Sequence, residues 1–337
     1  MRRTAHAGVL PCALVALLSS CSSDAPTAAD APASSAAPLL ATAGGSCGTP
    51  RRPGGVVEKV NVPSAWGVAV RDDGLTYFTQ PYDGGVGITS TQSRTIDGFI
   101  PTGENPTGLA FSPDGATAYV ANQSAQVSVV DVASRQTVAS IPVDNPLAVR
   151  VSPDGTQLFV ATGNTAVYIV DVATRAILKS VEVGYAPNGF AVHPDGRILY
   201  VSSFMGGTVS EIDMFTGTSL RTFEVGGTPQ EMALNRKGTK LYVANEAGYL
   251  NEIDLLSGNQ ASAIALPGGG FGVGVTPDDG QAYVSIPWAG VVQVFSLQTR
   301  QLTKTLTVGG EPRRIAFSQQ GHIGAITNTA GYITFVR

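Results

Sequence analysis

The sequence has few of the residues that most often carry out catalysis or bind metals. Its 337 residues include only three cysteines and three histidines. Cys12 and Cys21 lie near the N-terminus and Cys47 follows shortly after, so the stretch 56–337 contains no cysteine. That stretch can therefore form neither a disulfide nor a cysteine-based metal site. We expect no metal and no cofactor, and we interpret Cys47 as an incidental thiol.

Histidine, the commonest general base at neutral pH, is equally scarce. After the N-terminal segment only His193 and His322 remain, and both lie at Asp-Gly or Xaa-Gly turns. The motifs for haem attachment, phosphate loops, zinc proteases and serine hydrolases are all absent. The sequence therefore favours a protein that is not an enzyme, and it assigns no catalytic residue.

The chain also lacks an excess of positive charge. It has 21 Lys and Arg against 25 Asp and Glu, and without Arg2 and Arg3 the count is 19 against 25, a net charge of −6. Proteins that bind nucleic acid through its phosphates normally present a basic face. A nucleic acid is thus disfavoured as a partner.

Residues 1–21 have the features of an export signal. Arg2 and Arg3 supply positive charge, and the apolar core Val9–Leu18 is too short to span a bilayer as a helix. We therefore expect the protein to be exported.

The end of this signal resembles a bacterial lipobox. Leu18-Ser19-Ser20-Cys21 places small residues directly before a cysteine, and the resemblance implies that Cys21 becomes the lipidated first residue of the mature protein. Such lipid would anchor the chain to a membrane, facing the periplasm or the cell exterior. Ser22 is not the aspartate often associated with inner-membrane retention, which favours the outer membrane in a two-membrane cell. An ordinary signal peptide, cleaved near the same place, is the alternative.

Residues 22–55 are dominated by Ala, Pro, Ser, Thr and Gly and contain no aromatic residue. A segment of this composition buries too little apolar surface to offset its ordering entropy. We expect a disordered tether between the lipid and the remaining domain, residues 56–337.

The rest of the chain is a repeat array. Glycines at turns recur at positions 74, 115, 155, 196, 238, 280 and 321, with spacings of 41, 40, 41, 42, 42 and 41 residues. Each unit reads as four short strands rich in Val, Ala, Tyr and Phe, bounded by turns such as Pro113-Asp114-Gly115. Four strands in about 40 residues are typical of one β-propeller blade.

Counting the units gives an all-β fold, a seven-bladed β-propeller of four-stranded blades. The seventh unit, from Glu311, reaches the C-terminus after only three strands. Residues 56–62 (VVEKVNV) resemble the fourth strands of the other units and directly precede the first unit. We therefore predict that this N-terminal strand completes the last blade, which would leave no unpaired terminal edge.

The repeat resembles the YVTN family of β-propellers. Tyr119-Val120-Ala121-Asn122 and Tyr242-Val243-Ala244-Asn245 carry the motif, and the Val-Gly-Gly-Xaa-Pro joints at Pro229 and Pro312 fit it too. Similar propellers include surface-layer and periplasmic proteins, a single-stranded-DNA binder, cofactor-carrying oxidoreductase subunits, lactonases and a lyase. The resemblance thus implies the fold and leaves the function open.

Comparison of the repeats singles out three charged residues. In the first strand of each unit, the second and fourth residues after the proline position are Gly or Ala, as expected where blades converge on a central channel. The exceptions are Arg150, Glu231 and Arg314. A charge at the channel must reach water, a partner or a ligand. We weigh an ion pair between Glu231 and one arginine against a channel site for a small anionic ligand, which the arginine fork suits.

A second candidate site is the loop face, the end of the propeller whose loops join fourth to first strands and second to third strands. Aromatic residues gathered on one face suggest a recognition surface. The candidate ligand-binding residues there are Trp66, Tyr82, Tyr185, Asn188, Gln230, Trp288 and Arg313.

Together these features predict a membrane-tethered, extracytoplasmic binding or scaffold propeller, expected to be a monomer. It would recognise a ligand or an unknown protein partner at the loop face. The alternative is a lactonase-like hydrolase or a lyase that acts at the channel mouth. A third reading, binding of single-stranded nucleic acid through Trp66 and Trp288, has weaker support.

Overall fold

The computed structural model describes residues 55–90, 95–260, 262–318 and 323–336. All of them belong to one compact unit, Arg51–Arg337. The predicted export signal, the tether, the lipidation at Cys21, the thiol of Cys47 and the turn with His322 lie outside the described residues. In the described part of the chain, no helix has the length and apolar character needed to cross a bilayer.

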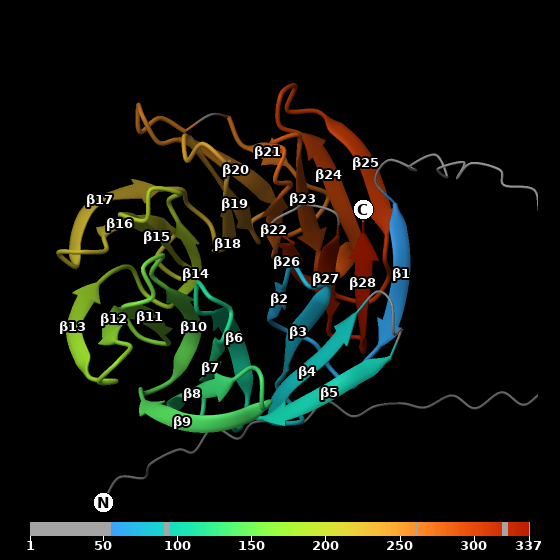
Figure 1. Ribbon diagram of the computed structural model, residues 1–337. Helices are drawn as coiled ribbons and strands as arrows, with labels where there is room; N and C mark the ends of the chain where they lie inside the picture. Colours follow the sequence, from blue (N-terminus) through green and yellow to red (C-terminus); the bar gives the residue numbers. More distant parts are fainter. Residues whose placement is uncertain (1–54, 91–94, 261, 319–322, 337) are drawn as a thin grey trace, which may run out of the picture. The chain divides into compact units, whose positions relative to one another are not determined.

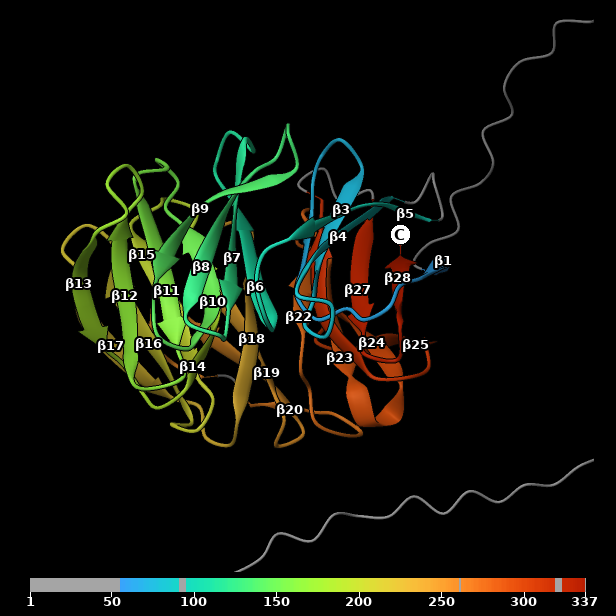
Figure 2. The same ribbon diagram turned by 90° about the horizontal axis from the view of Figure 1, so that it is seen from below.

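The fold is a seven-bladed β-propeller, as the repeat predicts. Seven four-stranded antiparallel sheets are arranged in a ring, with the first strand of each blade nearest the centre (Figure 1). Seen from the side, the strands run between the two ends of the ring (Figure 2). One end is the loop face defined above. The other end, which we call the turn face, carries the turns between first and second strands and between third and fourth strands.

Blades 1 to 6 each contain four strands that are consecutive in sequence. Blade 1 comprises β2 (Val68–Val70), β3 (Leu75–Gln80), β4 (Gly85–Ser90) and β5 (Ile96–Pro101), and blade 2 comprises β6 (Pro106–Phe111), β7 (Thr117–Asn122), β8 (Gln126–Asp131) and β9 (Gln136–Pro142). Blade 3 comprises β10 (Pro146–Val151), β11 (Gln157–Thr162), β12 (Ala166–Asp171) and β13 (Ile177–Glu182), and blade 4 comprises β14 (Pro187–Val192), β15 (Ile198–Ser203), β16 (Thr208–Asp213) and β17 (Thr218–Glu224). Blade 5 comprises β18 (Pro229–Leu234), β19 (Lys240–Asn245), β20 (Tyr249–Asp254) and β21 (Ile264–Ala265), and blade 6 comprises β22 (Val273–Val275), β23 (Gln281–Ile286), β24 (Val291–Ser296) and β25 (Leu302–Thr307), with a short 3-10 helix, η1 (Pro287–Ala289), between β23 and β24.

Blade 7 joins the two ends of the domain. Its strand order is β1-β28-β27-β26, built from β26 (Pro312–Phe317), β27 (Gly324–Asn328), β28 (Tyr332–Val336) and β1 (Val56–Asn61). β1 pairs antiparallel with β28, with Val56 opposite Val336 and Asn61 opposite Tyr332. The predicted closure by the N-terminal strand is therefore confirmed.

The hydrophobic core lies between the blades. Seven clusters of buried side chains each draw on two neighbouring blades, one cluster for every blade interface. The cluster at the closure packs Val60 and Phe335 of blade 7 against Phe78 of blade 1. Each blade therefore buries its apolar faces only when the ring is complete.

Small residues on the first strands allow neighbouring blades to approach closely, as the register predicts. A Cβ added at Gly67, Gly189 or Gly272 would lie 2.2–2.3 Å from a backbone carbonyl oxygen of the next blade. Such contacts are far below van der Waals distance, so these positions accept no side chain unless the backbone shifts.

Hydroxyl groups link neighbouring blades at the same level. Thr79, Ser202, Ser285 and Thr327 occupy equivalent positions on the second strands of blades 1, 4, 6 and 7. Each accepts a hydrogen bond from the first strand of its own blade and donates one to a first-strand or adjoining carbonyl of the next blade. At the ring closure, Arg314 N–H donates to Thr327 Oγ1 (3.0 Å), which donates to the Trp66 carbonyl (2.7 Å).

Candidate functional site

The three charged residues of the first strands meet in the central channel. Arg314 Nη1 of β26 lies 2.8 Å from Glu231 Oε1 of β18, and both side chains are largely buried. The pair joins blade 7 to blade 5, two blades away around the ring. The ion pair that the sequence analysis weighed as one alternative is present, with Arg314 as the partner of Glu231.

Two residues assigned to the loop face extend this network. Arg314 Nη2 donates to Asn188 Oδ1 (3.1 Å), and Asn188 Nδ2 donates to Gln230 Oε1. Gln230 is buried and Asn188 is half-buried. The structure therefore places both amides in a network that links blades 4, 5 and 7 across the loop end of the channel. For brevity we call Arg314, Glu231, Asn188 and Gln230 the cross-channel network.

Arg150 of β10 is the third charge of the channel. Its Nη2 donates to the Phe190 carbonyl (3.2 Å), and its side chain is exposed to the channel water. The surrounding blades nevertheless desolvate the guanidinium, which lowers the pKa of Arg150; nearby Glu231 raises that pKa and Arg314 lowers it. An arginine pKa starts so high that Arg150 stays charged at neutral pH.

The channel encloses a cavity of about 440 Å³. Among the described residues, the charged ones that line it are Arg150, Glu231 and Arg314, and nearly all the others are Gly, Ala or apolar residues. Two guanidinium groups and one carboxylate leave a net charge of +1. The lining continues to Pro277 and Ser318 at the turn face, whereas Asn188 is the one loop-face candidate that lines it. The cavity thus lies on the turn side of the cross-channel network.

A stacked cluster stands at the loop end of the ring. The Arg313 guanidinium lies 5.0 Å from the centre of the Trp66 ring and 4.8 Å from that of Phe271, and the two rings meet edge to face at 5.6 Å. Arg313 Nη2 also donates to Glu311 Oε2 (2.9 Å). These contacts hold Arg313 between blades 6 and 1, so its guanidinium is already engaged within the protein.

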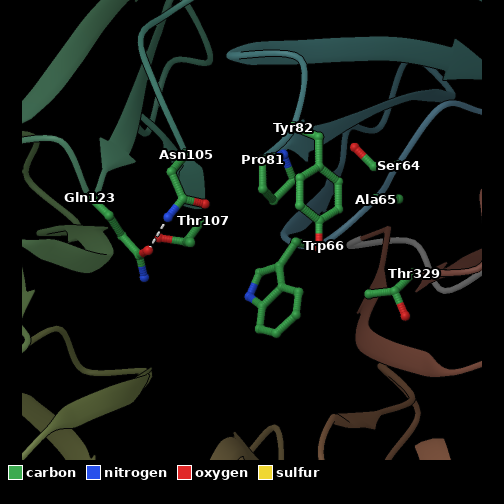
Figure 3. A pocket seen from close by; sticks show the side chains of 9 residues that line it. All are labelled: Ser64, Ala65, Trp66, Pro81, Tyr82, Asn105, Thr107, Gln123 and Thr329. Atoms are coloured by element: carbon green, nitrogen blue, oxygen red, sulfur yellow. Dashed lines mark hydrogen bonds between the residues drawn. The ribbon is translucent and has the colours of Figure 1, made fainter. Parts of the chain in front are cut away.

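A smaller pocket of about 150 Å³ opens on the loop face between blades 1, 2 and 7. Figure 3 shows Tyr82 and Trp66 of blade 1 in the middle of its wall, with Asn105 and Gln123 of blade 2 hydrogen-bonded to each other on one side. Thr329 of blade 7 lies on the other side. The sequence analysis missed Thr329 and Asn105 as site residues; their position in loops of the same face was the available signal.

Three of the aromatic side chains assigned to the loop face, those of Tyr82, Trp288 and Tyr185, are largely exposed to solvent. Tyr82 is 90 % exposed, Trp288 on η1 is 85 % exposed and Tyr185 is 51 % exposed. These three residues come from different regions of the ring. Only Tyr82 among them lines the 150 Å³ pocket, so they do not share it. Exposed aromatic rings are costly to leave in water, and they are common anchors at protein interfaces.

The titratable residues of the described chain show no metal centre. No group of three His, Cys, Asp or Glu side chains is placed to hold an ion among the described residues. His193 belongs to its turn: Nδ1 lies 2.7 Å from Asp195 Oδ1, and Nε2 lies 3.1 Å from the Gly238 carbonyl oxygen. It does not line the channel cavity.

Comparison with known proteins extends only to the fold. No family model matches the chain, and no curated protein matches it in sequence. Among solved structures, the chain is similar to Kuenenia stuttgartiensis hydrazine synthase, with a TM-score of 0.75 and 19 % identity, over 87 % of this chain and 99 % of that one. At this identity the likeness shows the shared architecture, that of a β-propeller, and nothing about activity.

Proposed function

We propose that the chain is a lipid-tethered, extracytoplasmic propeller of the YVTN type that recognises a protein partner at its loop face. The observation that carries this proposal is the exposure of Tyr82, Tyr185 and Trp288 at that one end of the ring. A propeller is a fold commonly used for binding and scaffolding. Its loops vary freely while the blades hold them in fixed positions.

Charge on the loop face favours a partner with a basic surface. The loop segments of this face contain five carboxylates and no Lys or Arg; the carboxylates are Asp83, Glu104, Asp144, Glu246 and Glu311. Glu311 forms an ion pair with Arg313 at the start of β26, so the other four carry the acidic character of the face. Asp83 and Glu104 are adjacent in sequence to Tyr82 and Asn105, which line the 150 Å³ pocket, and Asp83 Oδ2 accepts a hydrogen bond from the lining residue Ser64. Aromatic rings beside carboxylates suit lysine or arginine side chains, through cation–π and ionic contacts.

The entry point of the chain is compatible with this arrangement. Val56 pairs with Val336 at the turn-face end of β1, so the segment that precedes it joins the propeller at the turn face. A tether attached there would leave the loop face open to a partner. Lipidation itself is tested separately: labelled palmitate should enter the full chain and should not enter a Cys21→Ala variant.

Affinity capture tests the recognition surface. The full chain is compared with a Tyr82→Ser/Trp288→Ser variant and with a control variant, Phe215→Ser/Leu256→Ser, which removes two apolar residues that are 71 % and 82 % exposed on the turn face. We expect a partner that is captured by the wild type and the control and is lost from the loop-face variant at physiological salt. Equal capture by all three proteins would contradict the proposal.

A further inference from the structure

We propose that the central channel is a second, separate binding site that takes a small organic carboxylate with an apolar body, and that Arg150 binds its carboxylate group. The site lies on the turn side of the cross-channel network, away from the loop face. It therefore does not depend on partner recognition at the loop face.

The distribution of charge in the channel points to an anion. Arg314 and Glu231 neutralise each other in a 2.8 Å ion pair, and Arg314 also donates to Asn188. Among the described residues, Arg150 has no carboxylate partner and makes one hydrogen bond, to the Phe190 carbonyl. A guanidinium carries five N–H donors in a planar fork, so most donors of Arg150 face the cavity without a protein acceptor.

The channel is a less favourable setting for this charge than open solvent, although Arg150 itself is exposed there. Desolvation by the surrounding blades already opposes the charged form of Arg150. A carboxylate that accepts two parallel N–H bonds from the fork would offset that cost with matched geometry. The positive charge that remains after the Arg314–Glu231 pair is satisfied thus corresponds to one negative charge on the ligand.

The rest of the lining specifies the body of the ligand. Leu109, Phe190 and Met232 border the cavity, but their side chains are buried in the cores between blades. The exposed apolar side chains are nearer the turn face, where Phe111 and Phe317 line the cavity and are only partly buried. A volume of about 440 Å³ lies within the range of small-molecule sites. A hydrated inorganic anion would leave Phe111 and Phe317 uncovered, whereas an aliphatic or aromatic acid would bury its body against these two rings.

The ligand would enter from the turn face. The cavity lining reaches Pro277 and Ser318 at that end. At the loop end, the cross-channel network links blades 4, 5 and 7, and the cluster of Trp66, Phe271 and Arg313 packs at blades 6, 7 and 1, so side chains narrow this end. The ligand carboxylate would therefore travel inward until it meets Arg150, with the body trailing toward the turn face.

Calorimetric titration of the full chain with benzoate tests the site, with benzamide as a neutral ligand of matched shape. We expect benzoate to bind at one site and benzamide to bind more weakly by roughly tenfold or more, since the amide loses the charge-assisted pair. The variant Arg150→Gln should lose benzoate binding by a similar factor. The control Arg197→Gln, which removes an arginine that is 65 % exposed on the turn face, should bind benzoate like the wild type.

The proposal would be overturned by equal affinity for benzoate and benzamide, or by benzoate binding that survives Arg150→Gln. It would also be overturned if no acid in a series from acetate to octanoate and benzoate binds. If chloride competes with benzoate and binds as tightly, the site is an inorganic anion site and the organic assignment is wrong. Should Arg150→Gln fail to fold, Arg150→Lys keeps the charge without the fork and should still weaken benzoate. The Tyr82→Ser/Trp288→Ser variant should bind benzoate normally, which separates this test from that of the loop face.

Discussion

Arg314 of blade 7 forms its ion pair with Glu231 of blade 5, two blades away, at a distance of 2.8 Å. Gly272 of blade 6 lies between them, at a position where an added Cβ would meet the Arg313 carbonyl oxygen at 2.2 Å. The glycine therefore lets blades 6 and 7 pack closely where the backbone of Arg313 and Arg314 passes. The ion pair forms a bridge across the loop end of the channel.

Removal of the Glu231 carboxylate should strengthen anion binding in the channel. Glu231→Gln leaves Arg150 and Arg314 facing each other with a net charge of +2, and the unpaired Arg314 becomes a second anion ligand. We expect the affinity for benzoate to rise several-fold and the free energy of unfolding to fall by about 1–3 kcal/mol, because a largely buried charge loses its partner. Calorimetry and denaturant unfolding measure both effects.

The matched control is Glu104→Gln, which removes an exposed loop-face carboxylate. It should change neither benzoate affinity nor stability. If Glu231→Gln instead weakens benzoate binding, Glu231 positions Arg150 for the ligand and does not compete with it.

The hydroxyl at the ring closure should contribute measurably to stability. Thr327 Oγ1 accepts from Arg314 N–H and donates to the Trp66 carbonyl, and Thr327 is fully buried. Thr327→Val keeps the shape but leaves two buried polar groups without their partner, so we expect a loss of about 1–3 kcal/mol in the free energy of unfolding by denaturant. Thr327→Ser retains the hydroxyl and should recover most of this loss. Equal unfolding midpoints for the valine and serine variants would show that the bonds to the next blade are not needed.

The repeat made the fold predictable from sequence. The period near 41 residues, the Pro-Asp-Gly turns and the spare strand at residues 56–62 each specify one feature, and together they define seven closed blades. Internal register also located Arg150, Glu231 and Arg314 in the channel, because a charge at a position otherwise held by Gly or Ala stands out without any knowledge of side-chain contacts.

Register alone does not predict which charges pair. The Arg314 side chain reaches Glu231 two blades away, and Arg150 is left without an ion-pair partner among the described residues. Which arginine pairs with Glu231 depends on how far long side chains reach across the channel, and the sequence does not give the width of the channel. The roles of Asn188 and Gln230 were hidden for the same reason, since both were assigned to the loop face but lie at the starts of β14 and β18 and turn toward the network. By contrast, the hydroxyl groups that link neighbouring blades could have been predicted from the sequence. In four blades a Thr or Ser occupies the third position of the YVTN-like motif.

The two tryptophans should differ in fluorescence. Trp288 is 85 % exposed, whereas Trp66 is half-buried, with the Arg313 guanidinium 5.0 Å from its ring centre. We expect Trp288→Phe to leave an emission that is shifted to the blue and resists acrylamide. In that background Arg313→Gln should change the emission of Trp66 and raise its quenching, since it removes a cation from the ring face. Arg197→Gln should leave both unaltered, and an Arg313→Gln spectrum identical to its parent would contradict the stacked geometry.

The aspartates of the repeat turns should make stability depend on acid pH. Asp154 accepts hydrogen bonds from Ser152 Oγ (2.5 Å) and from Thr156 N–H (3.0 Å) and Oγ1 (2.9 Å), and these bonds lower the pKa of Asp154 below its ordinary value. Since the folded pKa is depressed, its contribution to stability is complete above the unfolded pKa of about 4 and is lost as the pH falls through the folded pKa.

Urea unfolding of wild type and Asp154→Asn at several pH values measures this contribution. The asparagine has no charge to lose, so we expect the variant to be less stable than the wild type at pH 7 and the difference to shrink steadily below about pH 4. Asp114 and Asp278 make equivalent bonds in blades 2 and 6, so their Asn variants should behave alike. A difference that stays constant down to about pH 2.5 would mean that the ionised carboxylate adds nothing to the turn beyond what an amide supplies.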